Sequence, residues 1–214
     1  MRKISAGTGL FLFLSFCALF AAPGCRLYSS YPNRLDLKAA ADLSRENPAE
    51  VAVLPVVDKT GNPNVQRFLP ELRRAFYRAL MDRRYTPLAL SYVDSVLRTL
   101  STGPVPLLKD LRGKFGEDAL LLVTVNSWNE KLLRVDRRIR AALEVHLVSS
   151  RTGREVWGGT VNLEIRVPGH GMPSPDEIPL LRREAMAILA SKVLAKLPRR
   201  KMGSYPVGTL PQGK

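Results

Sequence analysis

The sequence predicts an α/β fold in which helices pack on a mixed β-sheet within a single compact domain. Three observations support this prediction. Two continuous apolar runs, at residues 51–57 and 119–125, are typical of strands that are buried on both faces. Residues 139–148 and 156–167 alternate apolar and polar side chains on either side of a turn, as an antiparallel hairpin does. Apolar residues recur at helical spacing over residues 65–84, which predicts a long helix with one apolar face.

The N-terminal segment, residues 1–24, predicts an export signal. Arg2 and Lys3 precede a 13-residue apolar run at residues 10–22, which is short for a membrane span. The sequence Ala-Pro-Gly-Cys at residues 22–25 resembles the lipobox of bacterial lipoproteins, whose cysteine is lipidated and becomes the mature N-terminus. The resemblance implies that Cys25 carries the lipid. Cleavage of the same bond by ordinary signal peptidase would instead leave a soluble periplasmic protein.

The cysteine count favours the lipid. Cys17 leaves with the signal, so Cys25 would be the one cysteine of the mature chain. An unpaired thiol in an oxidising compartment is a liability unless it is modified. Arg26 follows the cysteine, and by resemblance to enterobacterial sorting the absence of Asp there directs a lipoprotein to the outer membrane. We therefore expect acyl chains such as palmitate on Cys25, and an anchored protein that faces the periplasm.

Both segments that flank the predicted domain, residues 50–197, have the composition of connecting or unstructured chain. Residues 25–49 contain Pro32 and several charges, which predicts a tether with one short helix at residues 36–45. Residues 198–214 are rich in Gly and Pro and are basic, which predicts a disordered tail.

Proline positions refine the first elements of the domain. Pro55 falls inside the apolar run at residues 51–57, and its missing N–H fits only at a bulge or at a strand end. Pro70 falls a few residues into the helix at 65–84, which predicts a kink or a late helix start. The remaining pattern predicts, in chain order, a short strand at 85–90, helices at 91–100 and 107–115, a Gly/Pro-rich loop at 167–175 and a long helix at 176–197.

No residue pattern predicts catalysis. The two cysteines exclude a disulfide framework, a cysteine-rich zinc site and a Cys-x-x-Cys redox motif. His170 lies between two glycines of a loop, but a single histidine without a second nearby ligand makes a poor metal site. His146 falls on the polar side of its strand, and the polar loop at residues 58–62 lacks phosphate-loop spacing. We expect no enzymatic activity, no metal and no cofactor.

The charge of the chain indicates an anionic partner. The formal net charge is +14, which would ordinarily suggest nucleic acid. Export excludes nucleic acid and leaves envelope proteins, lipid head groups and anionic polysaccharide. The arginine-rich face of the helix at residues 65–84 supplies the candidate partner-binding residues, and a merely solvated basic face explains the same pattern equally well. These candidates are Arg67, Arg73, Arg74 and Arg78.

Several short segments resemble the outer-membrane lipoproteins related to the curli-secretion protein CsgG. They are residues 51–56 with 58–61, residues 115–120, and residues 150–157. Within that group the sequence is most similar to a small lipoprotein family of unknown function that includes a meningococcal vaccine candidate, and more loosely to PelC and LpoB. The resemblance covers residues 51–197 and implies a compact, CsgG-like α/β periplasmic domain. It brings no catalytic residues with it, and no segments for the membrane-inserting hairpins of a CsgG pore are visible here.

The resemblance implies an accessory role in the cell envelope. We expect a lipid-anchored scaffold subunit of a secretion or assembly system, acting as a homo-oligomer or within a hetero-complex. An LpoB-like regulator of a peptidoglycan synthase is the alternative. A wall or polysaccharide hydrolase is a third hypothesis, which would require two facing carboxylates in a cleft.

Overall fold

The structure is a computed structural model that describes residues 31–100 and 108–201. The predicted signal peptide, Cys25, and the tail beyond residue 201 lie outside the described residues. Within them, seven strands form one mixed sheet, so the predicted fold class is confirmed. The strand order is β1 (Arg34–Ala39), β7 (Glu155–Arg166), β6 (Arg138–Ser149), β5 (Ala119–Asn129), β2 (Glu50–Val53) and β4 (Thr86–Pro87), with β3 (Val57–Asp58) also paired to β5.

The sheet is antiparallel at one side and parallel at the other. Strands β1, β7, β6 and β5 pair antiparallel, and β5 then pairs parallel with β2 and β3. The predicted hairpin is confirmed as β6 and β7, where Leu143 stands opposite Val161 on the buried face. The run predicted as one strand is divided into β2 and β3, and Pro55 lies in the break. The missing donor of Pro55 accounts for this position.

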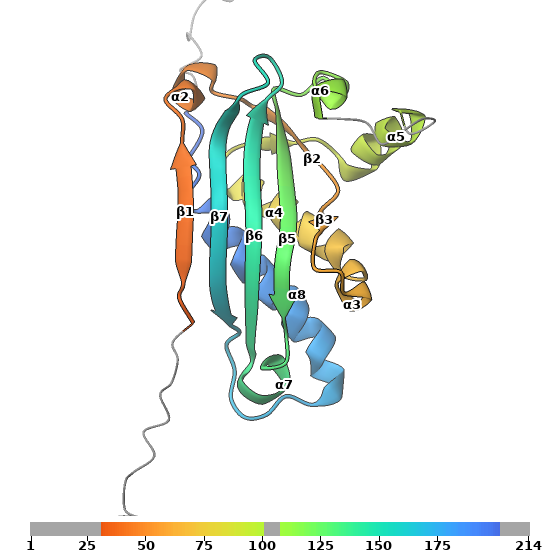
Figure 1. Cartoon of the computed structure of the whole chain (residues 1–214), viewed down its shortest axis with the longest axis vertical. Coiled ribbons are helices and arrows are strands. Elements are labelled where there is room, and N and C mark those ends of the chain that lie inside the picture. The colour runs from red at the N-terminus through yellow and green to blue at the C-terminus, as the bar shows by residue number, and fades with distance from the viewer. Residues whose placement is uncertain (1–30, 101–107, 202–214) are drawn as a thin grey trace, which may run out of the picture. The chain divides into compact units, whose positions relative to one another are not determined.

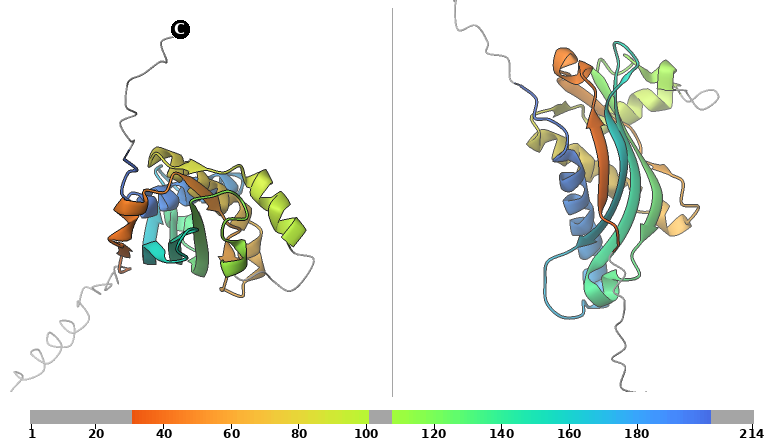
Figure 2. Two further views of the ribbon diagram at one scale, coloured as in Figure 1. Left: turned by 90° about the horizontal axis from the view of Figure 1, so that it is seen from above. Right: turned by 60° about the vertical axis from the view of Figure 1, so that its left-hand side comes forward.

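One face of the sheet is covered by α4 (Leu69–Asp82) and α8 (Ile178–Leu194), which enclose the main hydrophobic core. Figure 1 shows both helices behind the long strands, and the right-hand view of Figure 2 shows α8 running along that face. Two short helices, α3 (Pro63–Gln66) and α7 (Leu133–Asp136), lie at one end of this layer. Pro70 lies in the first turn of α4, as the late helix start predicts.

The other face is covered only in part. Helices α5 (Leu90–Leu100) and α6 (Leu108–Leu111) pack a second, smaller core against β2 and the adjoining end of β5. Its centre is formed by Ala52, Val93 and Leu120, each fully buried. Over β6, β7 and β1 no described helix covers this face, and most of its side chains there are polar. We call this uncovered part the open sheet face.

The predicted tether is wrong for its second half. Residues 34–39 form the edge strand β1, and α2 (Asp42–Glu46) replaces the longer helix that was expected at 36–45. Leu35 and Leu37 alternate with charged residues and pack against the main core, which is the pattern of a half-buried strand. Gly159 of β7 admits this strand, because a Cβ there would lie 2.0 Å from the carbonyl oxygen of Asp36. The folded domain therefore begins before residue 50.

The predicted tail also begins too early. The Tyr85 hydroxyl donates to the Pro198 carbonyl at 3.1 Å, and the Arg200 N–H donates to the Arg83 carbonyl at 3.2 Å. Asn47 donates its side-chain amide to the Lys201 carbonyl at 3.3 Å. Residues 198–201 are therefore hydrogen-bonded to the domain.

Candidate functional site

The four arginines predicted as a partner-binding face do not share one surface. Arg73 is buried, and its Nε and Nη2 donate to the Val53 carbonyl at 2.9 and 2.8 Å. Its Nη1 donates to Asp94 at 2.5 Å. The prediction that Arg73 binds a partner is therefore wrong. The side chain instead completes the hydrogen bonding at the end of β2 and joins α4 to α5.

The other three arginines are exposed but line different grooves. Arg74 and Arg78 lie on α4 above a groove of about 310 Å³ between α4 and α8, whose floor is made of small residues such as Ala75 and Ala187. Arg67 lies between α3 and α4 and lines a larger groove of about 810 Å³. We call this larger site the cationic groove.

The cationic groove is built where several elements end. Its walls are α3, the start of α4, the end of β5, α7 and the start of α8, all at the same end of the sheet in Figure 1. A register shift between Val125 and Ser127 bends β5 just before the groove. Asn129 then accepts the Lys131 N–H at 3.0 Å, which stabilises the turn that leads to α7.

Aromatic rings form part of the groove wall. The rings of Phe68 and Trp128 have centroids 4.7 Å apart, with Phe68 buried and Trp128 half-buried. The Arg182 guanidinium lies 5.7 Å from the Phe68 ring centroid and forms a bidentate pair with Glu130 at 2.7 and 2.8 Å. Desolvation raises the pKa of Glu130, but the hydrogen bond and charge of Arg182 outweigh it and hold that pKa below its usual range.

Cations exceed anions in the groove. Both of its carboxylates are already engaged, since Glu130 pairs with Arg182 and Glu71 pairs with Arg183 at 3.2 Å. Three exposed cations remain that form no ion pair with any described residue: Arg67, Lys131 and Arg134. Unpaired cations around a hollow surface attract and hold anionic groups.

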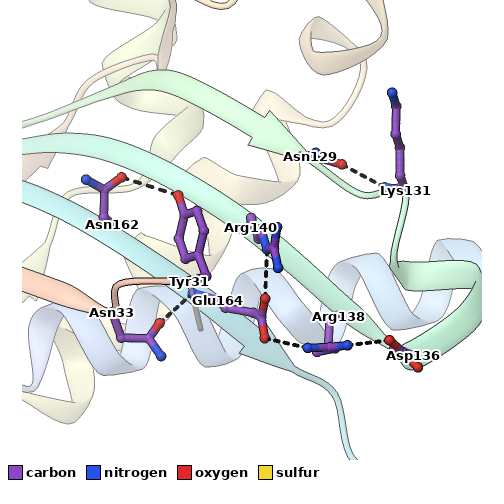
Figure 3. A network of polar contacts seen from close by, with 9 residues as sticks. All are labelled: Tyr31, Asn33, Asn129, Lys131, Asp136, Arg138, Arg140, Asn162 and Glu164. Atoms are coloured by element: carbon purple, nitrogen blue, oxygen red, sulfur yellow. Dashed lines mark hydrogen bonds and ion pairs between the residues drawn. The ribbon is translucent and has the colours of Figure 1, made fainter. Parts of the chain in front are cut away.

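The open sheet face adjoins the groove and carries a polar network (Figure 3). Glu164 accepts hydrogen bonds from Arg138 at 2.9 Å and from Arg140 at 2.7 Å. The Tyr31 ring lies 5.0 Å from the Arg140 guanidinium, and its hydroxyl donates to Asn162 at 3.4 Å. Desolvation raises the pKa of Glu164, but the two arginines outweigh it and lower that pKa. Because these groups satisfy one another, the network acts chiefly to bind the start of β1 to β6 and β7.

The remaining sequence candidates do not form a site. The exposed His170 lies in the loop after β7, where its carbonyl accepts from Arg137 at 3.3 Å. His146 lies on the sheet with Nδ1 2.8 Å from Glu155. Asp58 accepts from the backbone N–H and the hydroxyl of Thr60, each at 2.7 Å, which is a local turn. Within residues 31–100 and 108–201, no three His, Cys, Asp or Glu side chains converge in a geometry that would hold a metal ion.

Sequence reasoning missed most of the groove. Of its cations, only Arg67 is among the residues predicted from the sequence. A spacing signal did exist for Arg73, which lies four residues after Leu69 and three before Phe76, on the apolar stripe of α4. No comparable local signal exists for the groove, because its cations come from separate parts of the chain.

Comparison with known proteins identifies the fold. No protein-family model matches the sequence, and no curated protein matches it. Among solved structures, the PelC dodecamer from Paraburkholderia phytofirmans matches with a TM-score of 0.50 and 16% identity, covering 79% of this chain and 100% of that chain. Lipoprotein GNA1162 from Neisseria meningitidis matches at 0.47 and 19%, covering 70% and 99%. The C-terminal domain of LpoB from Escherichia coli matches at 0.38 and 17%, covering 54% and 82%.

These comparisons place the chain in a structural class. It is an α/β domain with helices on a mixed sheet, and its fold is similar to that of PelC. PelC, the meningococcal lipoprotein and LpoB were all named by the sequence resemblance, whereas the relation to CsgG stays a prediction. None of the described helices has the length and apolar character needed to cross a membrane.

Proposed function

We propose that the protein is a lipid-anchored accessory subunit of an outer-membrane secretion or envelope assembly system, which faces the periplasm and acts by binding. The observation that carries this proposal is the cationic groove, where three unpaired cations surround a hollow of about 810 Å³. The anchor is supported by the lipobox ending at Cys25.

The carboxylates of the groove favour binding over hydrolysis. A glycosidase needs one carboxylic acid whose pKa is raised, so that it can protonate the leaving group. The pKa of Glu130 is lowered instead, and its two oxygens are occupied by Arg182. Glu71 is likewise paired with Arg183. An accessory subunit that contributes a surface, and no reaction, fits these contacts.

A role in an assembly is supported by the fold. The PelC structure that it resembles is a dodecamer, so a domain of this fold can assemble into a large oligomer, for which a closed ring is one arrangement. A closed ring requires two different patches on each copy. The groove between α4 and α8, with Arg74 and Arg78 on its rim, can supply one of these patches; it adjoins the cationic groove, with which it shares Glu71 and Arg183. We propose that the protein works as a homo-oligomer or in a stoichiometric hetero-complex.

Fractionation of cells that express the full chain tests the anchor. We expect the wild-type protein in the outer-membrane fraction, with an intact mass that includes acyl chains on Cys25. Cys25→Ser should move the protein to the soluble periplasmic fraction. Cys17→Ser is the matched control, because it changes the other cysteine, within the predicted signal, and should leave the fractionation unchanged. An unmodified Cys25 thiol, or a Cys25→Ser protein that stays on the membrane, would refute the anchor.

Affinity capture from the same membranes tests the accessory role. We expect the captured, Cys25-anchored protein to bring with it further copies of the same chain or components of a secretion or assembly system. A capture dominated by a penicillin-binding protein would replace the proposal with regulation of a peptidoglycan synthase. Recovery of a monomer without any partner would refute both.

A further inference from the structure

The cationic groove has three kinds of side chain that together select one ligand chemistry. Three different segments supply its unpaired cations: the link between α3 and α4 (Arg67), the turn after β5 (Lys131) and α7 (Arg134). All three are exposed, so their charges face the solvent of the groove. A ligand that satisfies them must carry anionic groups at more than one position along its length.

The second kind of side chain is aromatic. Trp128 is half-buried, with Phe68 packed at a centroid distance of 4.7 Å behind it. The indole is therefore held in place and still reaches the groove, where it lines the wall beside the cations. A fixed aromatic ring offers a flat apolar surface, on which the C–H face of a ring-shaped ligand can stack.

The third kind is the side-chain amide. Asn62 and Asn129 line the groove, and each uses its Oδ1 to accept a backbone N–H, from Asn64 at 3.0 Å and from Lys131 at 3.0 Å. Those bonds fix the two amides and leave their Nδ2 groups without a partner among the described residues. An amide N–H₂ is a donor suited to hydroxyl oxygens.

Cations, a fixed aromatic surface and amide donors together match a ring that bears both a carboxylate and hydroxyls. We infer that the cationic groove binds an acidic oligosaccharide, with sugar-acid carboxylates at Arg67, Arg134 and Lys131 and a sugar face on Trp128. This inference rests on the proposed function and specifies its partner. An acidic peptide could bind the cations as well as the oligosaccharide does, but it has no sugar ring to stack on the indole and few hydroxyls to accept from the amides.

Binding to the full chain, extracted from membranes in detergent, tests the inference. The probe is a hexuronate oligosaccharide, compared with a neutral oligosaccharide of equal length and with polyglutamate of equal charge. We expect saturable binding of the hexuronate that weakens with added salt, and binding of both comparison ligands at least tenfold weaker. Equal affinity for polyglutamate, or no binding of the hexuronate, would overturn the inference.

Paired substitutions separate the groove from the general charge of the protein. Arg67→Gln with Arg134→Gln should weaken hexuronate binding by about tenfold or more. Arg151→Gln with Arg199→Gln is the matched control, since it removes the same two charges from exposed positions that line neither the cationic groove nor the groove between α4 and α8. The control pair should bind within about twofold of wild type. An equal loss in both pairs would show attraction by net charge alone and would overturn the groove assignment.

Tryptophan fluorescence reports the stacking directly. The chain has two tryptophans, and Trp157 is only 1% exposed, so a change on binding comes from Trp128. Trp128→Phe keeps an aromatic ring against Phe68 and should abolish the fluorescence change. A change that persists in Trp128→Phe would refute the stacking. The anchor and capture experiments use no sugar ligand, so failure of this inference is distinguishable from failure of the proposed function.

Discussion

Replacement of the buried Arg73 by methionine should destabilise the domain and loosen α5. In the parallel pair of β2 and β4, the Leu88 N–H donates to the Val51 carbonyl, and the next donor along β4 would have to donate to the Val53 carbonyl. The chain enters α5 at residue 90 instead, so Arg73 supplies the donors from α4. Arg73→Met keeps the alkyl packing of the side chain but removes every donor.

The magnitude is set by the groups left without partners. The Val53 carbonyl is buried and would lose both of its donors, which costs about 1–3 kcal/mol. The pair with Asp94 adds about 0.5 kcal/mol, because the Asp94 side chain is 47% exposed and screened by water. Relief of the desolvation of a buried guanidinium offsets part of this loss. We expect a net decrease of about 2 kcal/mol in the free energy of unfolding.

Urea unfolding of the two neighbouring variants measures the effect. Arg74→Met is the control, since Arg74 is exposed on the same helix and should change the free energy of unfolding by less than about 0.5 kcal/mol. Hydrogen exchange should become faster in α5 for Arg73→Met and stay unchanged for Arg74→Met. Equal stabilities of the two variants, or unchanged exchange in α5, would refute the role assigned to Arg73.

Three further predictions test other contacts. Gly159→Ala should lower the free energy of unfolding by about 1–3 kcal/mol and expose β1 to hydrogen exchange, because the new Cβ would clash with the Asp36 carbonyl. Gly171→Ala is the control: Gly171 also has a positive φ but has open space around it, so this variant should leave β1 protected. Glu164→Gln should lower the free energy of unfolding by about 1–2 kcal/mol at neutral pH. Because the pKa of Glu164 is lowered in the folded state, this difference in stability should disappear as pH falls below about 4, which urea unfolding at a series of pH values measures. Burial raises the pKa of Tyr85 to about 12, so the stability that depends on its neutral form is present below pH 10 and is lost as pH rises towards 12. An ultraviolet titration in which Tyr85→Phe removes no late-ionising tyrosine would contradict this assignment.

The parts of the fold that could be predicted are those with a long, regular pattern. In the hairpin, burial alternates over residues 138–147 of β6 and 160–166 of β7, and the break at Pro55 reflects its missing donor. Strand β1 has only two large apolar side chains, Leu35 and Leu37, within six residues. Its place in the sheet depends on the space left at Gly159, more than a hundred residues away, which no local pattern reports.

The site was less predictable than the fold. The number of arginines along one predicted helix pointed to Arg67, but it does not distinguish exposed from buried arginines. That distinction requires the position of each arginine relative to the apolar stripe of the helix, in which Arg73 lies. The cationic groove gathers side chains from α3, β5, α7 and α8, and its shape depends on the register shift in β5. Such a site arises from packing, so its residues carry no shared spacing in the sequence.

Native mass measurement of the full chain extracted from membranes tests the central claim most directly, because one spectrum reports both the lipid and the assembly. The proposed function predicts a mature chain that begins at Cys25, carries acyl chains, and is found in a complex heavier than one copy. Arg74→Glu with Arg78→Glu, on the groove between α4 and α8, should shift that complex towards single copies if this groove is one of its contacts. A single, unacylated copy with a free Cys25 thiol would contradict the claim that the protein is a lipid-anchored subunit of an envelope assembly.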